Sequence, residues 1–425
     1  MVDESAAMLR FMADRLQGLR GHRSGQSSDP PSTRAASTLL LQAAQRRGHG
    51  GGGDNPAMSA ELPAPAAPAA PPAPPAPAAG CARRAALTLL LALPLQAQAT
   101  RFKPGSATAP SYARHTAAEA FAAEVAERHG LPLVWIDAQL AQAQRLDAVR
   151  KLIMPPPAGT AKNWAAYRAR FVEAQRITAG LVFWRNNEAW LQEAQDRWGV
   201  PADIVVAIIG VETFYGRITG NFRIIDALAT LAFDFPPGRK DRSALFRSEL
   251  EEFFVLCARE GSDPLTVKGS YAGAMGLPQF LPSSVNRFAV DMDGDGHIDL
   301  QRNAADAIGS VAHYFASFGW QRDLPTHFEV AVPVDSAERA VLLGPDILPS
   351  FSAAQFAERG AVLSDAGRAH DGPLALVELQ NGDAAPSYVA GTQNFYVVTR
   401  YNWSSYYALA VIELAAALRA ARLRR

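Results

Sequence analysis

Apolar residues recur at intervals of three and four positions along much of the chain, which is the spacing of amphipathic helices. This pattern predicts helices over residues 114–130, 243–260, 304–318 and 404–421, and two more helices within residues 162–198. Few linkers interrupt the chain after residue 110. We therefore expect the later three quarters of the chain to be mostly helical.

An almost unbroken apolar run extends from Ile204 to Val211. The run is ambiguous by pattern alone, because its β-branched residues and its continuity also suit a buried strand. Pro201 stands before it, where the first turn of a helix tolerates proline, and Asp203 is favourable beside the positive helix end. We therefore predict a buried helix, and Glu212 follows at its C-terminal end.

Residues 326–336, 374–380 and 393–400 have the β-like character of strands. We predict that they form one small sheet. Taken with the helical segments, they predict a mainly α fold class (α+β), with a small β element late in the sequence.

The first eighty residues differ in composition from the rest. Residues 60–80 are almost only alanine and proline and have nothing to bury, so we expect residues 1–80 to be a disordered, low-complexity extension. Residues 81–99 have the parts of a secretory signal peptide: two arginines, a short apolar stretch and the small-residue cleavage site Ala97-Gln98-Ala99. The apolar stretch is too short for a permanent membrane helix.

This order of segments predicts export to the periplasm, with residues 100–425 as the mature region. No lipobox precedes a cysteine near the cleavage site, so we expect no lipid anchor. A signal peptide that begins so late suggests translation from a later start, and Met58 is our candidate. The alternative is a chance alanine- and leucine-rich helix after a linker.

The chain has 425 residues, and its basic and acidic side chains balance at 41 each. This neutrality argues against nucleic acid as a partner, since polyanion binding usually shows as a basic excess. The two cysteines, Cys81 and Cys257, cannot form a disulfide framework and match no zinc pattern. Cys257 lies on the apolar side of a predicted helix, where we expect it to belong to the core.

The stretch GVETFYGRITG, residues 210–220, places Glu212 directly after the buried apolar run. A carboxyl group held against apolar surface favours its protonated form, and a protonated carboxyl can donate its proton to a leaving glycosidic oxygen. Phe214 and Tyr215 could wall such a site, because sugar faces stack well on aromatic rings. The alternative is that Glu212 only pairs with Arg217 at the helix end.

A glycine-rich stretch, KGSYAGAMGLPQFLPSS, covers residues 268–284. Its glycines allow close approach to the backbone, Ser270 and Gln279 offer hydrogen bonds, and Phe280 offers a stacking surface. It is neither a Walker loop nor a dinucleotide fingerprint, and we predict no organic cofactor. The alternative is an ordinary connection before a helix.

Residues 291–306, DMDGDGHIDLQRNAAD, match the first half of a calcium-binding loop. Carboxylates at alternate positions converge on one hard cation, and the following glycine permits a sharp turn. The usual glutamate at position twelve is absent, since Arg302 stands there, and Asp306 is the best displaced ligand. The alternatives are a plain Asp/Gly turn and a capping pair formed by Asn303 and Asp306.

The stretch TRYNWSSYYALAV, residues 399–411, is a dense polar and aromatic cluster before an apolar helix. Sugar-binding walls have this composition, because flat apolar faces combine with polar tips. The alternative is a set of core and surface aromatics without a ligand.

These four stretches, in this order, resemble the membrane-bound lytic murein transglycosylase B family over roughly residues 114–421. The resemblance implies a lysozyme-like, mainly helical catalytic domain with an EF-hand-like calcium loop and a small β element. It implies that Glu212 is the single catalytic acid and base. The residues that it implies for substrate binding are Tyr167, Arg242, Ser270, Gln279, Phe280, Tyr314, Tyr401, Asn402 and Tyr407.

The resemblance also implies a structural calcium ion, with the ligands Asp291, Asp293, Asp295, the carbonyl of His297, and Asp306. It implies peptidoglycan glycan strands as the partner, and we also consider proteins of cell-wall synthesis or division. Founding members of the family carry a lipid anchor, which we do not expect here.

The implied reaction is cleavage of the bond between N-acetylmuramic acid and N-acetylglucosamine without water, which leaves a 1,6-anhydro ring. A first rival is a muramidase-type hydrolase, which needs a second carboxylate. Asp226 is the nearest in sequence, although its surroundings indicate a helix start. A second rival is a non-catalytic scaffold that binds peptidoglycan, and a calcium sensor is a weaker third.

Overall fold

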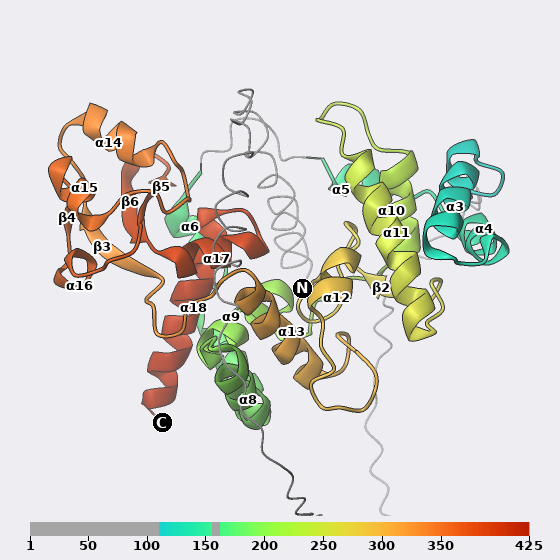
Figure 1. Ribbon diagram of the computed structural model, residues 1–425, viewed down its shortest axis with the longest axis horizontal. Coiled ribbons are helices and arrows are strands. Elements are labelled where there is room, and N and C mark those ends of the chain that lie inside the picture. Colours follow the sequence, from blue (N-terminus) through green and yellow to red (C-terminus); the bar gives the residue numbers. More distant parts are fainter. Residues whose placement is uncertain (1–109, 155–161, 425) are drawn as a thin grey trace, which may run out of the picture. The chain divides into compact units, whose positions relative to one another are not determined.

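The computed structural model describes residues 110–154 and 162–424. The predicted low-complexity extension and signal peptide lie outside the described residues. Figure 1 labels the elements.

In chain order the helices up to the calcium-like loop are α3 (Thr116–His129), α4 (Leu133–Gln142), α5 (Asp147–Leu152), α6 (Trp164–Ala169), α7 (Ala174–Asn186), α8 (Glu188–Trp198), α9 (Ala202–Thr213), α10 (Ile224–Phe233), α11 (Ser243–Glu260) and α12 (Pro282–Phe288). The later helices are α13 (Ala304–Ser317), α14 (Ser336–Leu343), α15 (Ala353–Glu358), α16 (Asp365–Arg368), α17 (Gln393–Tyr401) and α18 (Ser405–Leu423). Within residues 110–154 and 162–424, no helix has both the length and the apolar character needed to cross a membrane.

The strands of the described residues form two antiparallel sheets. They are β1 (Phe222–Arg223), β2 (Lys268–Gly269), β3 (His327–Ala331), β4 (Val362–Leu363), β5 (Ala375–Asn381) and β6 (Ala384–Gly391). β1 pairs with β2, and the other four have the order β4-β3-β6-β5. The small late sheet is therefore confirmed, although its membership differs from the prediction.

The prediction of a strand over residues 393–400 is wrong, because this segment lies within helix α17. The hydroxyl of Thr392 caps the helix by accepting a hydrogen bond from Asn394 N, at 3.1 Å. Phe395, Val398 and Tyr401 are buried at helical spacing, and this tertiary burial outweighs their β-like composition. Within this sheet the prediction missed β4 and β6, and the alanines and Pro386 of β6 give that strand little β-like character.

The helix predictions are otherwise confirmed by α3, α9, α11, α13 and α18. Residues 162–198 hold three helices instead of two, because the chain breaks between α6 and α7 and again at Asn187. At this second break, the Asn187 side chain donates a hydrogen bond to Phe183 O, at 2.8 Å.

Two apolar cores hold these elements together. The larger core is built around α9, which is buried from Asp203 to Thr213 and contacts α7, α8, α13 and α18. The smaller core lies on one face of the late sheet, beneath α14 and α15, and includes Phe328 and Leu376. Successive residues of β5 alternate between the two cores.

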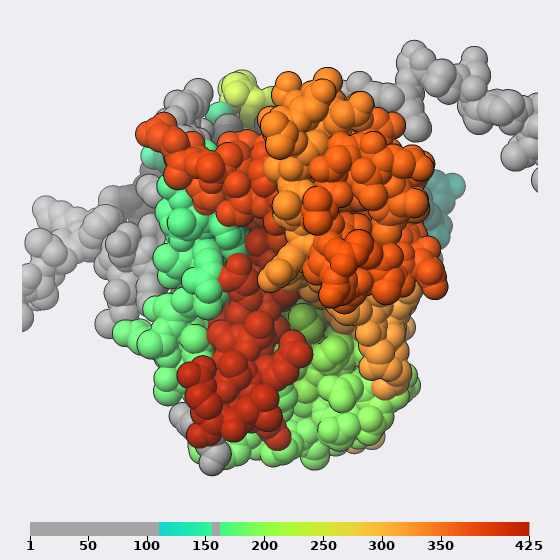
Figure 2. Space-filling view, turned by 90° about the vertical axis from the view of Figure 1, so that its left-hand side faces the viewer, coloured from blue at the N-terminus to red at the C-terminus, as the bar shows by residue number. Residues whose placement is uncertain are grey.

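Helix α18 joins the sheet to the helical core. It contacts α6 and α7 on one side, β5 on another, and α9 along its length. Figure 2 shows this face, with α18 in dark red between the green helices and the orange sheet. Residues near the C-terminus are thereby brought against the helix that carries Glu212.

Candidate active site

Glu212 lies in the last turn of α9 and is fully buried, with 0% of its surface exposed. The helix ends directly after it, because Phe214, Tyr215 and Gly216 all take left-handed φ angles of 51°, 59° and 86°. The hydroxyl of Thr213 holds this turn by accepting a hydrogen bond from Gly216 N, at 3.0 Å. The carboxyl group is therefore fixed at the end of a rigid, buried helix.

Tyr407 is a hydrogen-bond partner of this carboxyl group. Its hydroxyl donates a hydrogen bond of 2.8 Å to Oε1 of Glu212. Tyr407 is also fully buried, and its ring lies nearly parallel to that of Tyr401, with centroids 6.2 Å apart and an interplanar angle of 13°. A hydrogen bond of this length is well formed, so Tyr407 holds the carboxyl group of Glu212 in one orientation.

The glycine-rich loop is tied to the turn that follows Glu212. The side-chain amide of Gln279 donates to Thr219 O at 3.1 Å and to Gly276 O at 3.0 Å. The hydroxyl of Thr213 lies 3.0 Å from Leu277 O, to which it donates. Gly220 must be glycine, since its φ is +90° and a Cβ there would lie 2.2 Å from Gly269 O. The structure therefore places Gln279 beside the turn that follows Glu212.

Ser270 shapes the glycine-rich loop from within. It is buried, and its hydroxyl accepts hydrogen bonds from Ala274 N at 3.0 Å and Ala272 N at 3.3 Å. Its proton remains able to donate to a third group. Ser270 is thus a loop-forming residue as well as a candidate for substrate binding.

Three predicted binding residues form a packed aromatic cluster. Phe280 has 0% exposure, and its ring centroid lies 5.5 Å from that of Tyr314 and 5.8 Å from that of Tyr401. Tyr314 donates to Arg400 O at 2.7 Å, and Tyr401 donates to Pro278 O at 2.6 Å. These contacts fasten α13 and α17 to the glycine-rich loop. In the described structure, Phe280 is a core residue and offers no open stacking face.

Asn402 directly follows α17 and has only 2% exposure. Its side-chain nitrogen and oxygen are both buried, and neither finds a hydrogen-bond partner within residues 110–154 and 162–424. A buried amide without partners is costly. Asn402 therefore brings two buried polar atoms to the end of α17.

Tyr167 and Arg242 come from elements that flank α9 and the glycine-rich loop in the sequence. Tyr167 is on α6, where its ring packs against Tyr406 of α18, with centroids 5.8 Å apart. Arg242 precedes the first turn of α11 and is half-buried. Both side chains are therefore partly accessible, as residues that bind a substrate must be.

Arg217 and Asp226, on which the two local alternatives depend, make contacts of their own. The guanidinium of Arg217 lies over the ring of Phe214, 4.7 Å from its centroid, and not against Glu212. Asp226 lies in the first turn of α10, where Arg223 donates to both of its oxygens and Gln144 N donates to Oδ1 at 2.9 Å. Asp226 is therefore a structural ion-pair residue.

The acidic loop brings three of its predicted ligands together. Carboxylate oxygens of Asp291, Asp293 and Asp306 all lie within 4.8 Å of one another. Asp306 is buried and accepts hydrogen bonds from Met292 N and Asp299 N, at 2.9 and 2.8 Å. Hard oxygen donors are the ligands that calcium prefers, and these three carboxylates could supply part of its usual six to eight.

Asp295 lies outside that group, and its carboxylate accepts a hydrogen bond of 2.8 Å from His297 N. Asn303 caps α13, as one alternative predicts, and its amide also donates to Asp293 at 2.8 Å. Capping by Asn303 and convergence of the carboxylates therefore occur together.

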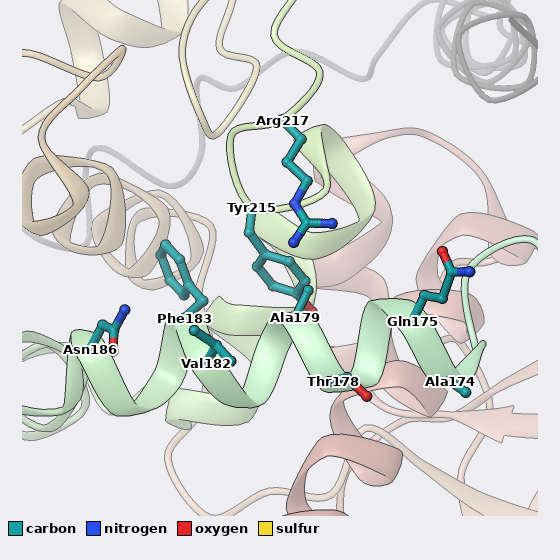
Figure 3. A pocket seen from close by; sticks show the side chains of 9 residues that line it. All are labelled: Ala174, Gln175, Thr178, Ala179, Val182, Phe183, Asn186, Tyr215 and Arg217. Atoms are coloured by element: carbon teal, nitrogen blue, oxygen red, sulfur yellow. The ribbon is translucent and has the colours of Figure 1, made fainter. Parts of the chain in front are cut away.

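Two features beside the site were not found from the sequence. The ring of Tyr215 is wedged between α7 and α9, where a Cβ on Gly180 or Gly210 would lie 2.3 or 2.5 Å from its hydroxyl. A pocket of about 670 Å³ lies beside this ring and is lined by one face of α7, Tyr215 and Arg217, whose side chains Figure 3 shows. Only the glycines could have indicated this close approach.

The mainly helical fold is that of the lysozyme-like lytic transglycosylases of known structure. Residues 113–416 match the family described as Transglycosylase SLT domain, and the chain belongs to this family. The expected family resemblance and helical fold are thereby confirmed.

Three relatives illustrate the match. Membrane-bound lytic murein transglycosylase B of Escherichia coli K12 is 39% identical over 320 residues, which cover 73% of this chain and 85% of that protein. Soluble lytic transglycosylase SltB1 of Pseudomonas aeruginosa is 39% identical, with a TM-score of 0.66 over 72% of this chain and 99% of that one. Lytic transglycosylase Slt35 of Escherichia coli, solved with calcium, is 37% identical, with a TM-score of 0.64 over 74% of this chain and 96% of that one.

Proposed function

We propose that this chain cleaves the β-1,4 bond between N-acetylmuramic acid and N-acetylglucosamine in peptidoglycan, as an exported lytic transglycosylase. The observation that carries the proposal is the fully buried Glu212 with the Tyr407 hydroxyl 2.8 Å from its Oε1. The printed name of the Escherichia coli relative, which describes action on murein, supports the same substrate class.

The state of the other buried carboxylates supports a one-acid mechanism. Among the described residues, the others with almost no exposure are Asp203, Asp226, Glu249 and Asp306. Each of them has a structural role. Asp203 forms an ion pair with Arg419 at 2.7 Å, and Asp226 forms one with Arg223. Glu249 accepts a hydrogen bond from the Ser283 hydroxyl, and Asp306 accepts one from Met292 N in the acidic loop. A hydrolase with a second catalytic carboxylate is therefore less well supported.

The proposed reaction uses Glu212 twice. The protonated carboxyl first gives its proton to the glycosidic oxygen as the bond to C1 of the muramoyl residue breaks. The positive charge that develops at C1 is stabilised by the substrate's own acetamido group or by dipoles of the site. The carboxylate then takes the proton of the muramoyl C6 hydroxyl, whose oxygen bonds to C1. No water enters the product.

The glycan strand would contact the residues around this carboxyl. The Asn402 amide has two buried polar atoms to offer, and the Ser270 hydroxyl retains its proton as a donor. Tyr401 and Tyr407 would position the acid, while Phe280 and Tyr314 support them through packing. Tyr167 and Arg242 would act at more distant sugars, and Gln279 would fix the loop beside the acid.

The acidic loop fits a calcium ion by the chemistry and convergence of its donors. Asp291, Asp293 and Asp306 would hold the ion, with Asp295 and the carbonyl of His297 completing the set. A bound ion would neutralise these carboxylates and brace the loop against α13. The Slt35 structure solved with calcium supports calcium as the ion.

Export remains part of the proposal. Residues 81–99 would be removed as a signal peptide, so that residues 100–425 act in the periplasm. Amino-terminal sequencing of the exported protein checks this directly. A mature chain that begins upstream of Ala82 would contradict it.

Mass spectrometry of purified peptidoglycan after digestion tests the reaction. Wild-type protein should release fragments one water lighter than muramidase products, and Glu212→Gln should release none while still binding strands. Glu193→Gln, which changes an exposed carboxylate on α8, is the matched control and should retain activity. Ordinary reducing ends would establish a hydrolase, and binding without cleavage by the wild type would establish a scaffold.

A further inference from the structure

We propose that the pocket between α7 and the turn after Glu212, called here the α7 pocket, binds an acidic peptide. The peptide would be the stem carried by the strand that is cleaved at Glu212, so this inference rests on the proposed function. The pocket has a volume of about 670 Å³, which falls in the usual range for small-ligand sites.

The α7 pocket is rigidly connected to the catalytic residue. Tyr215 and Arg217, which line it, stand three and five positions after Glu212 in a turn that Thr213 holds by hydrogen bonding. Figure 3 shows Tyr215 reaching down to α7, with Arg217 above the same helix. Because Gly180 and Gly210 leave room only for the Tyr215 ring, the turn cannot shift freely. A ligand in the pocket is therefore held at a fixed offset from Glu212.

The charge in the pocket selects for an anion. Arg217 is exposed and is the only lining residue that is charged at neutral pH. Within the described part of the chain, no carboxylate forms an ion pair with Arg217, whose contact is the face of Phe214 at 4.7 Å. Arg176 lies over the same ring at 4.6 Å but has Glu173 within 3.9 Å. Arg217 can therefore receive a carboxylate in a paired, planar contact.

The remaining lining suits a peptide better than a bare sugar. Gln175, Thr178 and Asn186 offer side-chain donors and acceptors that match backbone amides. Val182, with 41% exposure, and the ring of Phe183 offer apolar surface for small aliphatic side chains. Peptidoglycan stems combine free carboxylates, amides and methyl groups, whereas a sugar ring alone would not need the cation.

Binding to the inactive Glu212→Gln protein tests this inference without relying on the reaction. We would titrate the full chain by calorimetry with matched oligosaccharide strands that carry or lack stem peptides. The parent should bind the stem-bearing strand about tenfold more tightly, the gain expected from one charge-assisted contact. Adding Arg217→Glu should abolish that preference. Adding Arg185→Glu, the same charge change at an exposed α7 position outside the pocket, should leave it intact.

A second variant guards against a folding defect in the turn. Val182→Asp places a repelling carboxylate at an exposed pocket position, and it should lower the stem preference as Arg217→Glu does. The inference is overturned if the parent shows no preference for stems, or if Arg217→Glu weakens both strands equally. The proposed reaction is judged separately, by the mass of the wild-type products.

Discussion

The Tyr407 hydroxyl donates a hydrogen bond of 2.8 Å to Oε1 of Glu212, across 195 positions of the chain. It links the first turns of α18 to the last turn of α9, and both residues are fully buried. In such surroundings a bond to a carboxylate is stronger than it would be in water. Tyr407 therefore fixes the orientation of the proposed acid.

Tyr407→Phe should lower kcat by about 10- to 100-fold, because a hydrogen bond to a charged group contributes roughly 1.5–3 kcal/mol. Steady-state release of anhydro-ended fragments measures this. Tyr406→Phe removes the neighbouring hydroxyl, which bonds to Gln380 of β5, and should change kcat little. Equal effects of the two substitutions would show that α18 acts only through packing.

Gly210→Ala should destabilise the protein by about 1–3 kcal/mol, as overpacking does in cores. The added Cβ would lie 2.5 Å from the Tyr215 hydroxyl, and this clash outweighs the helix propensity gained. Urea unfolding measures the loss. The same change should cost clearly less in a Tyr215→Ala background, and additive effects would refute the proposed wedge.

Calcium should raise the midpoint of thermal unfolding. At a concentration a hundred times the dissociation constant, the gain is about 2.7 kcal/mol. Asp293→Asn should weaken this response because one converging carboxylate is lost, whereas Asp323→Asn, in another exposed turn, should not. Identical melting in calcium and in chelator would rule out a stabilising ion.

Burial raises the pKa of Glu249, against the opposing hydrogen bonds from Ser283. Between its ordinary value of 4.5 and the raised value, the folded state binds more protons than the unfolded state. The free energy of unfolding therefore falls as pH rises through this window. Glu249→Gln should lack this fall, which urea titrations at pH 4 and pH 7.5 can measure. Parallel pH profiles would contradict the assignment.

Burial, with a smaller effect of Asp263, raises the pKa of the Cys257 thiol to about 12. Since the thiolate is the reactive form, labelling at pH 8 should be roughly a thousandfold slower in the folded protein than after unfolding. The measurement requires a Cys81→Ser background, in which Cys257 is the remaining cysteine. Fast labelling of the folded protein would mean that the packing around α11 opens readily.

The local sequence was sufficient to predict secondary structure where a start signal and an apolar run agree. The apolar run before Glu212 predicts burial and the preceding Pro201 predicts a helix, and α9 confirms both. Residues 393–400 were wrongly predicted as a strand from their β-like composition. The cap at Thr392 and the tertiary burial of these residues make the segment a helix.

Long-range partners were not predictable from spacing. No residue pattern near Tyr407 predicts a contact with Glu212, and only the family resemblance assigned both residues to one site. In the structure, the Tyr407 hydroxyl lies 2.8 Å from Oε1 of Glu212. The exposure of side chains was not predictable either. Phe280 and Asn402 were both predicted to bind substrate. In the structure, Phe280 is a core residue, and Asn402 is a buried amide without hydrogen-bond partners among the described residues. The α7 pocket depends on Gly180, Gly210 and the turn after Glu212, and no sequence motif links these three features.

The contact between α18 and α9 also sets an order of assembly in time. Glu212 and the glycine-rich loop are synthesised early, while the hydroxyl that meets the carboxyl arrives with the nineteen residues of α18, Ser405–Leu423. A chain still being made thus lacks the donor to its acid until this helix is released and docked. The proposed acid of this lytic transglycosylase thus meets its tyrosine donor only after α18 has been made.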